Sequence, residues 1–532
     1  MGMDLSGWNP RLDEAEAELE QGIQLGFGGA DGRDALRRAE RISTEVLEAQ
    51  PGDTRALLVR ARACFCLGYE AGRFSEDSLP FLRQAAKDLL EIPSCQDLVL
   101  ERAWTFLMCL VPLAEAGEEI ESWANRAREC VNRLVELNPN DPDALRARAE
   151  LSCALGDVAD IQGDDPLPLY DRALREFRAV GEAGGDVDDE LGRVEVRRGE
   201  LLGRRGLDPV PAFRRALRFF ARASREFDDD PSHALHAGQT FLLLAASLKD
   251  AAARAARKRA IGCFEEALKK DPHCVSALLG RAQAYLRRSE GSPPRQSLRF
   301  LVSAQADLEM ARSIAPDSAE VHAEAGLVGL LKLCALTRLD SDVTDDVCAT
   351  ALTAMRSLDR ALALDPANMS AHEYRARLRL TLWSSGLSNL FPGELLGGVI
   401  ADASEAIRSE PLRVKALNCR AAARMYRAVD LAPRERLDEL LRAESDVELI
   451  LWHWPEDSIA SSLKSRILLH RAQVEVQLGI PSLHTIRRAL DANTRSGEEA
   501  LAPGERELLR RLARSLSSVG LGKRGVNEGS SC

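Results

Sequence analysis

The chain has 532 residues, of which 45% are hydrophobic, 29% charged and only 5% aromatic. Alanine, leucine, arginine and glutamate dominate, and these residues favour packed helices over sheets. The formal net charge of −12 argues against a general nucleic-acid-binding surface, because phosphate binding requires clustered Lys and Arg. We therefore expect an all-α chain that has no nucleic acid partner.

The N-terminal residues MGMDLSGWNPRLDEAEAELE are acidic and lack the basic and apolar segments of a signal peptide. The best apolar run, residues 103–114, is shorter than the roughly 18–20 residues of a membrane span and contains Pro112. Gly2 and Ser6 match a short myristoylation pattern, but a single acyl chain binds membranes only marginally. The twelve cysteines are scattered, which is typical of buried thiols in a reducing compartment. These features predict a cytoplasmic protein that has no membrane partner.

Prolines at the ends of expected helices divide the chain into a repeating unit. From Pro231 onward they lie 41 to 50 residues apart, and the two earlier intervals are about twice as long. A second pattern, Ala-x-x-x-Arg-Ala, begins five residues after a proline at 56–61, 144–149, 277–282, 371–376 and 416–421. The shared phase of the two patterns indicates internal repetition with a period of about 45 residues. The prolines are Pro51, Pro139, Pro231, Pro272, Pro316, Pro366, Pro411 and Pro455.

The best-preserved unit is residues 259–286, where small and large residues share one helix face before a proline turn. The residues that carry its motif are Ala260, Phe264, Ala267, Pro272, Arg281 and Ala282. This pattern resembles the tetratricopeptide repeat, most specifically over residues 259–423. The resemblance implies a right-handed superhelical α-solenoid of stacked antiparallel helix pairs. The family's repeat has about 34 residues, so the extra residues lengthen either helices or loops, and HEAT or armadillo packing remains an alternative.

The repeat divides the chain into three expected regions. Residues 1–30 would form an N-terminal capping helix and a Gly-rich linker, residues 31–519 one continuous repeat array, and residues 520–532 a flexible tail. The Trp-rich segment 451–455 and the amphipathic stretch 504–519 would cap the C-terminal end of the array, where no further repeat covers the apolar face.

Residues that could carry chemistry have ordinary structural interpretations. His233 and His236 could share a helix face near Asp228–Asp230, and Cys263 lies near His273 and Cys274, but neither group has further ligands at metal-site spacing. The glycines at 26–32 and 520–525 lack the strand and helix that a nucleotide-binding loop requires. No motif of nucleophilic catalysis occurs. We expect no catalytic residue, no metal site, no cofactor and no enzymatic activity.

The arginines of the repeated pattern have two interpretations. They could form a ladder that holds an acidic peptide through bidentate contacts, or each could pair with a carboxylate of the adjacent helix while its stem covers apolar surface. The second interpretation is favoured, because each arginine stands beside a packing alanine. The residues are Arg60, Arg148, Arg281, Arg375 and Arg420.

By the same resemblance, a peptide groove is lined by the residues two positions before and after each arginine. These pairs are Leu58 and Arg62, Arg146 and Glu150, Leu279 and Gln283, Glu373 and Arg377, and Asn418 and Ala422. They do not reproduce the Lys/Asn/Arg clamp of chaperone-binding family members. The expected function is a non-catalytic scaffold that binds a peptide or protein of unknown identity along its concave groove. A docking or regulatory subunit of a separate catalytic partner is the alternative, and a helical-repeat enzyme is the third possibility.

Overall fold

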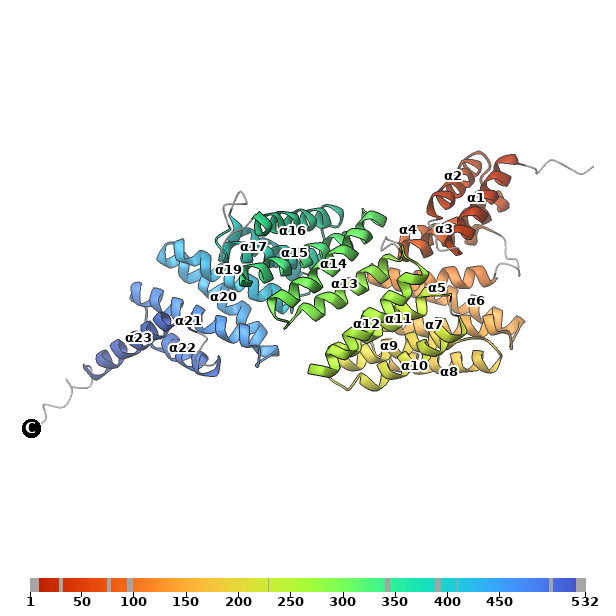
Figure 1. Ribbon diagram of the computed structural model, residues 1–532. Helices are drawn as coiled ribbons and strands as arrows, with labels where there is room; N and C mark the ends of the chain where they lie inside the picture. Colours follow the sequence, from red (N-terminus) through yellow and green to blue (C-terminus); the bar gives the residue numbers. More distant parts are fainter. Residues whose placement is uncertain are drawn as a thin grey trace, which may run out of the picture. The chain divides into compact units, whose positions relative to one another are not determined.

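The computed structural model describes residues 9–27, 32–73, 78–92, 99–227, 229–339, 345–387, 394–408, 410–496 and 501–522. These residues form 23 α-helices and one short 3-10 helix, and no strand occurs among them (Figure 1). The all-α prediction is confirmed. The helices fall into two compact units, one comprising residues 1–291 and 306–318 and the other residues 292–305 and 319–532.

The first unit contains thirteen complete helices and the C-terminal part of α14 among its described residues. Their bounds are α1 (Pro10–Phe27), α2 (Arg33–Ala49), α3 (Thr54–Arg73), α4 (Leu79–Glu91), α5 (Val99–Glu115), α6 (Glu121–Leu137), α7 (Pro142–Gln162), α8 (Leu167–Glu182), α9 (Asp188–Arg204), α10 (Val210–Glu226), α11 (Pro231–Ala246), α12 (Asp250–Lys270) and α13 (Val275–Ser289), with α14 spanning Pro294–Ile314.

The second unit contains the N-terminal part of α14 and the helices that follow. Their bounds are α15 (Ala319–Leu339), α16 (Asp345–Leu364), α17 (Met369–Ser384), α18 (Leu395–Arg408), α19 (Val414–Arg427), the 3-10 helix η3 (Ala428–Asp430), α20 (Pro433–His453), α21 (Ser458–Gln477), α22 (Leu483–Ser496) and α23 (Pro503–Gly522).

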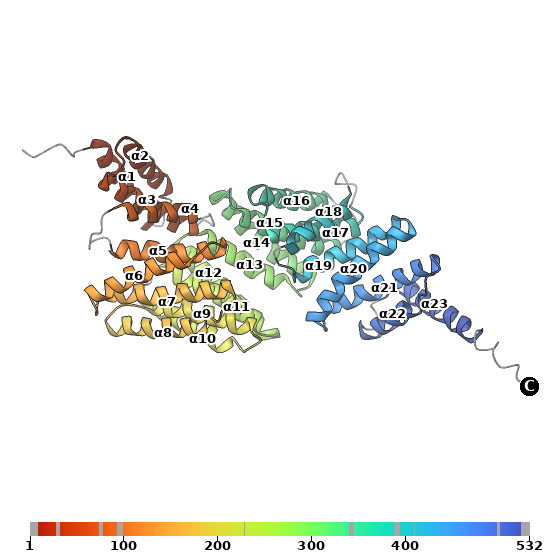
Figure 2. The same ribbon diagram turned by 180° about the vertical axis from the view of Figure 1, so that it is seen from behind.

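Consecutive helices pack in pairs, such as α11 with α12 and α15 with α16, which lie side by side in Figures 1 and 2. The first helix of a pair also contacts the first helix of the next pair, as in the series α15, α17, α19 and α21. Helix pairs that bury their apolar faces against their neighbours are the defining feature of an α-solenoid. In the repeat of α15 and α16 the long period reflects long helices, which have 21 and 20 residues, whereas α17 and α18 have 16 and 14.

Several first helices begin at a capping side chain next to the proline turn. The carboxylate of Asp230 accepts a hydrogen bond from the amide of Ser232 at 2.8 Å, and the side chain of Asn368 accepts one from the amide of Ala371 at 2.9 Å. Asp457 caps α21 in the same way. A capping oxygen satisfies an amide that otherwise lacks a partner, so these residues fix where the helix starts.

The core is built from a large side chain that packs against glycines of neighbouring helices. Phe264 of α12 is fully buried, and a Cβ atom added at Gly238 of α11 or at Gly280 of α13 would lie 2.7 or 2.5 Å from its ring. Ala260, Ala267 and Ala282 are buried as well. The motif of residues 259–286 therefore consists of packing residues, with the exposed Pro272 in the turn between α12 and α13.

The expected C-terminal cap needs correction. The segment 451–455 ends α20 and is followed by α21, α22 and α23, so it lies within the series of helices. Trp452 is 84% exposed and Trp454 is 42% exposed, so these rings do not cover the end of the core. Residues 28–31 of the expected linker and 523–532 of the expected tail lie outside the described residues. In the described parts of the chain, no helix is long and apolar enough to cross a membrane.

Candidate binding face and the arginine clasps

The repeated arginines connect the two helices of a pair. Arg281 of α13 donates hydrogen bonds from Nε and Nη2 to the two carboxylate oxygens of Asp307 in α14, at 2.9 and 2.6 Å. Asp307 is only 6% exposed. Two parallel bonds of this kind are the strongest geometry that an arginine and a carboxylate adopt. We call such a bidentate pair between an arginine of the repeated pattern and an aspartate of the following helix an arginine clasp.

The same clasp recurs in three other helix pairs. The Nε and Nη2 distances to the carboxylate are 2.8 and 2.7 Å for Arg60 and Asp88, 3.0 and 2.7 Å for Arg375 and Asp402, and 3.1 and 2.7 Å for Arg420 and Asp446. The arginine precedes its aspartate by 26 to 28 residues in all four clasps. Each of these four arginines therefore pairs with a carboxylate of the adjacent helix, as the second of the two interpretations predicts.

The fifth arginine, Arg148 of α7, has a looser contact. Its Nε lies 3.7 Å from Oε1 of Glu176 in α8, beyond hydrogen-bonding distance. Glu176 instead accepts hydrogen bonds from Ser152 at 2.5 Å and from Arg172 at 2.9 Å. The longer glutamate side chain is shared among several donors, and no bidentate pair forms at this position.

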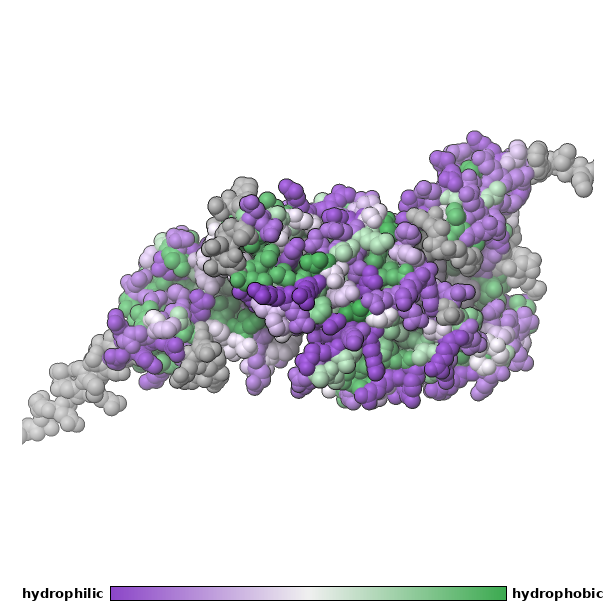
Figure 3. All heavy atoms as spheres, in the orientation of Figure 1, coloured by the Kyte–Doolittle hydropathy of each residue, from purple (hydrophilic) through white to green (hydrophobic). Residues whose placement is uncertain are grey.

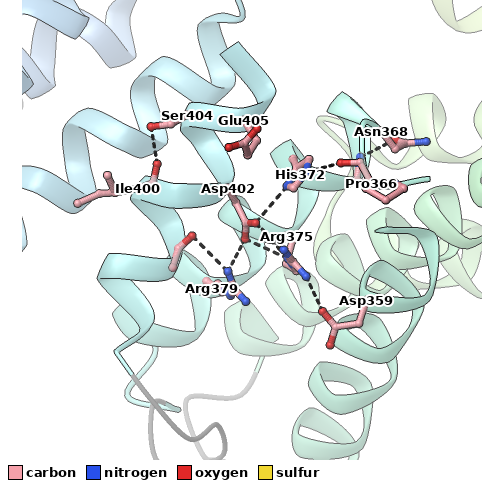
Figure 4. A network of polar contacts seen from close by, with 12 residues as sticks. Asp359, Pro366, Asn368, His372, Arg375, Arg379, Ile400, Asp402, Ser404 and Glu405 are labelled. Carbon is pink, nitrogen blue, oxygen red and sulfur yellow. Dashed lines mark hydrogen bonds and ion pairs between the residues drawn. The ribbon is translucent and has the colours of Figure 1, made fainter. Parts of the chain in front are cut away.

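The clasp of Arg375 belongs to a larger network around Asp402, shown in Figure 4. Asp402 is 2% exposed and also accepts a hydrogen bond from Nη1 of Arg379 at 2.5 Å. Nδ1 of His372 lies 3.2 Å from the same carboxylate, and Nη1 of Arg375 donates to Asp359 at 2.8 Å. The network ties α16, α17 and α18 together. Its charges satisfy one another, so it holds the scaffold rather than a ligand.

In the first unit, most of the predicted groove residues are also paired within the protein. Nη2 of Arg62 lies 2.7 Å from Glu101 of α5, and Glu150 accepts a hydrogen bond from Arg193 of α9 at 2.8 Å. Arg146 donates to the carbonyl oxygen of Asp186 at 2.5 Å. Leu58 is half-buried against the core around it. These side chains join successive first helices to one another.

The predicted pair on α13 differs in character. Leu279 is buried, and Gln283 is half-buried. Leu279 therefore serves the core of the first unit. Gln283 is the polar member of the predicted groove pair on α13.

In the second unit, the predicted residues lie on α17 and α19, which pack against each other. Oε2 of Glu373 lies 3.4 Å from Nη1 of Arg413, and Oε1 lies 3.6 Å from Nη1 of Arg377. Asn418 is half-buried, and its side-chain oxygen is buried without a hydrogen-bond partner in the protein. Ala422, one helical turn further along α19, is also half-buried.

Sequence reasoning missed an aromatic and cationic group on the same series of helices. Nη1 of Arg466 in α21 donates to the hydroxyl oxygen of Tyr426 in α19 at 3.0 Å, and its Nε lies 3.4 Å from Glu505. The ring centroid of Tyr426 lies 4.5 Å from that of Trp383. Arg466 follows Pro455 by the same interval as Arg377 follows Pro366, so the proline phase could have found it. The Ala-x-x-x-Arg-Ala pattern is absent from that repeat.

We use the name first-helix face for this surface of α17, α19 and α21. Figure 3 shows apolar side chains gathered where Figure 1 places α17 and α19, with hydrophilic side chains between them. Such a mixture of apolar area and a few oriented polar groups is suited to binding. The defining residues are Glu373, Arg377, Asn418, Tyr426 and Arg466.

The cysteine and histidine candidates have other roles. Burial raises the pKa of the Cys263 thiol to about 11, and Cys263 lies on the packed helix α12. His233 and His236 both contact Asp189 of α9. Among the described residues, no group of three or more His, Cys, Asp and Glu side chains is arranged to hold a metal ion.

No family profile and no curated protein matches the sequence. Solved structures with similar folds include TTC0263, a thermophilic TPR protein of Thermus thermophilus, at 21% identity and a TM-score of 0.30, covering 44% of this chain and 98% of that one. A tetratricopeptide repeat protein from Parabacteroides merdae covers 61% and 98%, at 12% identity and a TM-score of 0.32. The human IFIT1 dimer with m7Gppp-AAAA covers 91% and 94%, at 14% identity and a TM-score of 0.34.

The expectation that nucleic acid is excluded as a partner is wrong. IFIT1, a helical-repeat chain matched over most of this one, was solved with the capped oligonucleotide m7Gppp-AAAA. Net charge describes the whole surface, whereas a binding site depends on the charges that line it locally. A net charge of −12 therefore does not decide this question.

The proline turns, the alanine-lined helix pairs and the packing of each first helix against the next are features of this chain itself. This packing requires only small residues, a large side chain and a turn at a fixed register. The chain is an all-α helical-repeat protein whose helix pairs stack as a solenoid.

Proposed function

We propose that this protein is a non-catalytic interaction scaffold that holds an extended segment of a protein partner on the first-helix face of α17, α19 and α21. The observation that carries the proposal is the side-chain amide of Asn418, whose buried oxygen has no hydrogen-bond partner in the protein. Leaving a buried acceptor unpaired costs about 1–3 kcal/mol, and a bound ligand can supply the missing donor.

The chemistry of an amide matches the main chain of a peptide. A side-chain amide offers one acceptor and two donors, so it can bond to the N–H and C=O groups of an extended segment whatever its sequence. Nearby, Arg377 lies 3.6 Å from Glu373, a longer contact than those of the clasps. Arg377 is therefore the cation of this face that can turn toward an acidic group of the partner at low cost.

Tyr426 and Trp383 would supply the apolar contact area of this face. Their rings are half-buried and 4.5 Å apart, and Arg466 holds the Tyr426 hydroxyl through a 3.0 Å hydrogen bond. Rings that are already ordered lose little conformational entropy on binding. A preorganised face of this kind supports affinity from several modest contacts.

The state of the thiols supports a non-catalytic role. Burial raises the pKa of Cys109, of Cys153 and of Cys419 to about 12, so these thiols stay protonated near neutral pH. A thiolate is the nucleophilic form of cysteine. These three cysteines are therefore packing residues.

The test is site-specific photo-crosslinking at residue 422, beside Asn418, followed by identification of the crosslinked peptide. A synthetic version of that peptide is then titrated against the wild-type chain, Asn418→Ala and Asn132→Ala, an exposed position on α6. We expect Asn418→Ala to weaken binding by about 5–150-fold, which corresponds to 1–3 kcal/mol, and Asn132→Ala to leave it unchanged.

Equal affinity of the two variants would contradict the proposal, as would capture of the peptide by a crosslinker at residue 132 but not by one at residue 422. A parallel titration uses a capped oligonucleotide, m7Gppp-AAAA. If that ligand binds and its affinity falls in Asn418→Ala while no peptide is crosslinked, the face serves nucleic acid and the peptide proposal is rejected.

A further inference from the structure

Two histidines of α11 converge on one carboxylate of α9 in the first unit. Nδ1 of His236 lies 2.9 Å from Oδ1 of Asp189, and Nδ1 of His233 lies 3.2 Å from the same oxygen. Because a carboxylate oxygen only accepts, each Nδ1 must carry a proton and donate. The residue pair is separated by helix α10 in sequence, so the contact joins one repeat to the next.

The second nitrogen of His233 is the unusual atom of this cluster. The residue is 6% exposed, and its Nε2 is buried without a hydrogen-bond partner in the protein. The carboxylate oxygen Oδ2 of Asp230 lies 3.8 Å from this Nε2 atom. In the neutral ring, with Nδ1 donating to Asp189, Nε2 presents a lone pair toward that carboxylate. In the protonated ring, Nε2 presents an N–H to it.

The charges around His233 come from every side of the cluster. Asp189 and Arg193 lie on α9, Asp186 precedes α9, Asp230 caps α11, and His236 lies on α11 itself. Oγ of Ser232 lies 3.5 Å from Nδ1 of His233, and Nζ of Lys270 in α12 lies 3.4 Å from the carbonyl oxygen of Asp230. The ring of Phe227 lies 6.2 Å from that of His233, and the ring of Phe220 lies 5.5 Å from that of His236. Three carboxylates thus face the imidazole.

The balance of these effects favours a charged ring. The hydrogen bond to Asp189 raises the pKa of His233, burial opposes the rise, and the charges of Asp189, Asp230 and Asp186 add to it. For Asp189, burial alone would raise the pKa, but the hydrogen bonds from His233 and His236 and the charge of Arg193 hold it well below its ordinary range. The carboxylate remains charged wherever the histidine titrates.

We propose that His233 and Asp189 form a proton-sensitive joint, which ties α11 to α9 when the imidazole of His233 is protonated and loosens when the imidazole is neutral. A group whose pKa is higher in the folded than in the unfolded state stabilises the fold below its unfolded pKa. The joint is therefore fully formed below pH 6.5, the ordinary value, and weakens as pH rises through the raised pKa of His233.

The other side of α9 does not share this dependence. Arg193 bonds to Glu150 at 2.8 Å and Arg197 bonds to Asp157 at 2.7 Å, which ties α9 to α7. Arginine stays charged at all pH values that proteins experience. Neutralising His233 therefore weakens the tie between α11 and α9 while α9 keeps its contact with α7. Histidine supplies such switches because its charge changes near neutral pH.

The first experiment follows the histidine rings of the full-length wild-type chain by nitrogen-15 NMR as pH is varied. We expect His233 to titrate above pH 6.5, the ordinary value for histidine, with Nδ1 protonated in the neutral form. A midpoint at or below pH 6.5 overturns the proposal. This measurement needs no substitution, so it holds even where a variant fails to fold.

The second experiment measures amide hydrogen exchange of α9 and α11 at pH 6 and pH 8, with intrinsic exchange rates corrected for pH. In the wild type we expect α11 to lose protection at pH 8 relative to α7. Asp189→Asn removes the carboxylate charge and should abolish that difference. Asp188→Asn is the matched control, because Asp188 lies on the same turn and bonds to Arg222 instead, at 2.6 Å.

The control should keep the wild-type difference between pH 6 and pH 8. Loss of pH dependence in both variants would mean that general charge, and not the joint, governs exchange. An unchanged difference in Asp189→Asn would equally reject the proposal.

Discussion

Arg281 and Asp307 hold α13 against α14 through two parallel hydrogen bonds of 2.9 and 2.6 Å, with the carboxylate almost removed from solvent. The hydrogen bond to Asp307 raises the pKa of Arg281, burial opposes the rise, and the charge of Asp307 adds to it. A buried ion pair is costly to break from one side, because the remaining charge has no partner. The clasp therefore marks where a single substitution is most damaging.

We predict that Asp307→Ala lowers the free energy of unfolding by about 1–3 kcal/mol, since it leaves the half-buried guanidinium of Arg281 without its carboxylate partner. Urea denaturation followed by circular dichroism measures the loss as a lower midpoint. Arg148→Ala is the comparison in the same register, and it should cost less than Asp307→Ala, because Arg148 stands 3.7 Å from Glu176 without a bidentate pair. An equal decrease in the free energy of unfolding in the two variants would show that the position in the repeat, and not the bidentate geometry of the clasp, determines the stability change.

Two glycine substitutions should act in opposite directions. At Gly280 an added Cβ would lie 2.5 Å from the ring of Phe264, so Gly280→Ala should destabilise by about 1–3 kcal/mol through overpacking. At Gly262 in α12 nothing lies within 4 Å of the added atom, so Gly262→Ala should stabilise by about 0.5–1 kcal/mol through helix propensity. Thermal denaturation of both variants gives the comparison, and a shift of the same sign in both would contradict it.

His470 of α21 should oppose His233 in its response to pH. Burial lowers the pKa of His470, so its charged form is disfavoured in the folded state. A group of this kind destabilises the fold when pH falls below its ordinary pKa of 6.5. We therefore expect the wild type to lose more thermal stability between pH 7.5 and pH 5.5 than His470→Gln does. His453→Gln, at an exposed position, is the control and should behave like the wild type.

Trp452 and Trp383 should differ in their contribution to stability. Trp452 is 84% exposed, so Trp452→Ala should change the free energy of unfolding by less than about 0.5 kcal/mol. Trp383 packs against Tyr426, with ring centroids 4.5 Å apart, so Trp383→Ala should cost at least about 2 kcal/mol. The same variants report on the fluorescence of the two rings, and red-shifted emission should decrease in Trp452→Ala. A large loss of stability in Trp452→Ala would mean that this ring is buried in solution.

The sequence predicts the fold well because packing depends on local register. Ala260, Phe264 and Ala267 share a helix face for geometric reasons, and that face must be covered by a neighbour. The partners of the arginines were also within reach, since an acidic residue stands 26 to 28 positions after each arginine that forms a clasp. That spacing is the number of residues between the arginine on the first helix of a pair and the position that faces it on the second helix.

The binding face and the histidine joint could not be predicted in the same way. Asp189 and His233 are separated by 44 residues, and their contact depends on how α9 and α11 stack. The burial of the Asn418 oxygen likewise depends on how α19 packs against other helices. The prediction that segment 451–455 caps the array is wrong, because α21, α22 and α23 follow it and Trp452 is 84% exposed.

Each arginine clasp lies between the two helices of one pair, so a helix pair carries its own internal fastening wherever it stands in the chain. Duplicating or deleting a whole pair would add or remove a clasp complete with both of its partners. A cut within a pair would separate an arginine from its aspartate. Whole periods are therefore the units by which a chain of this type can change length during evolution, and the turns that carry the prolines are where such a change would begin and end.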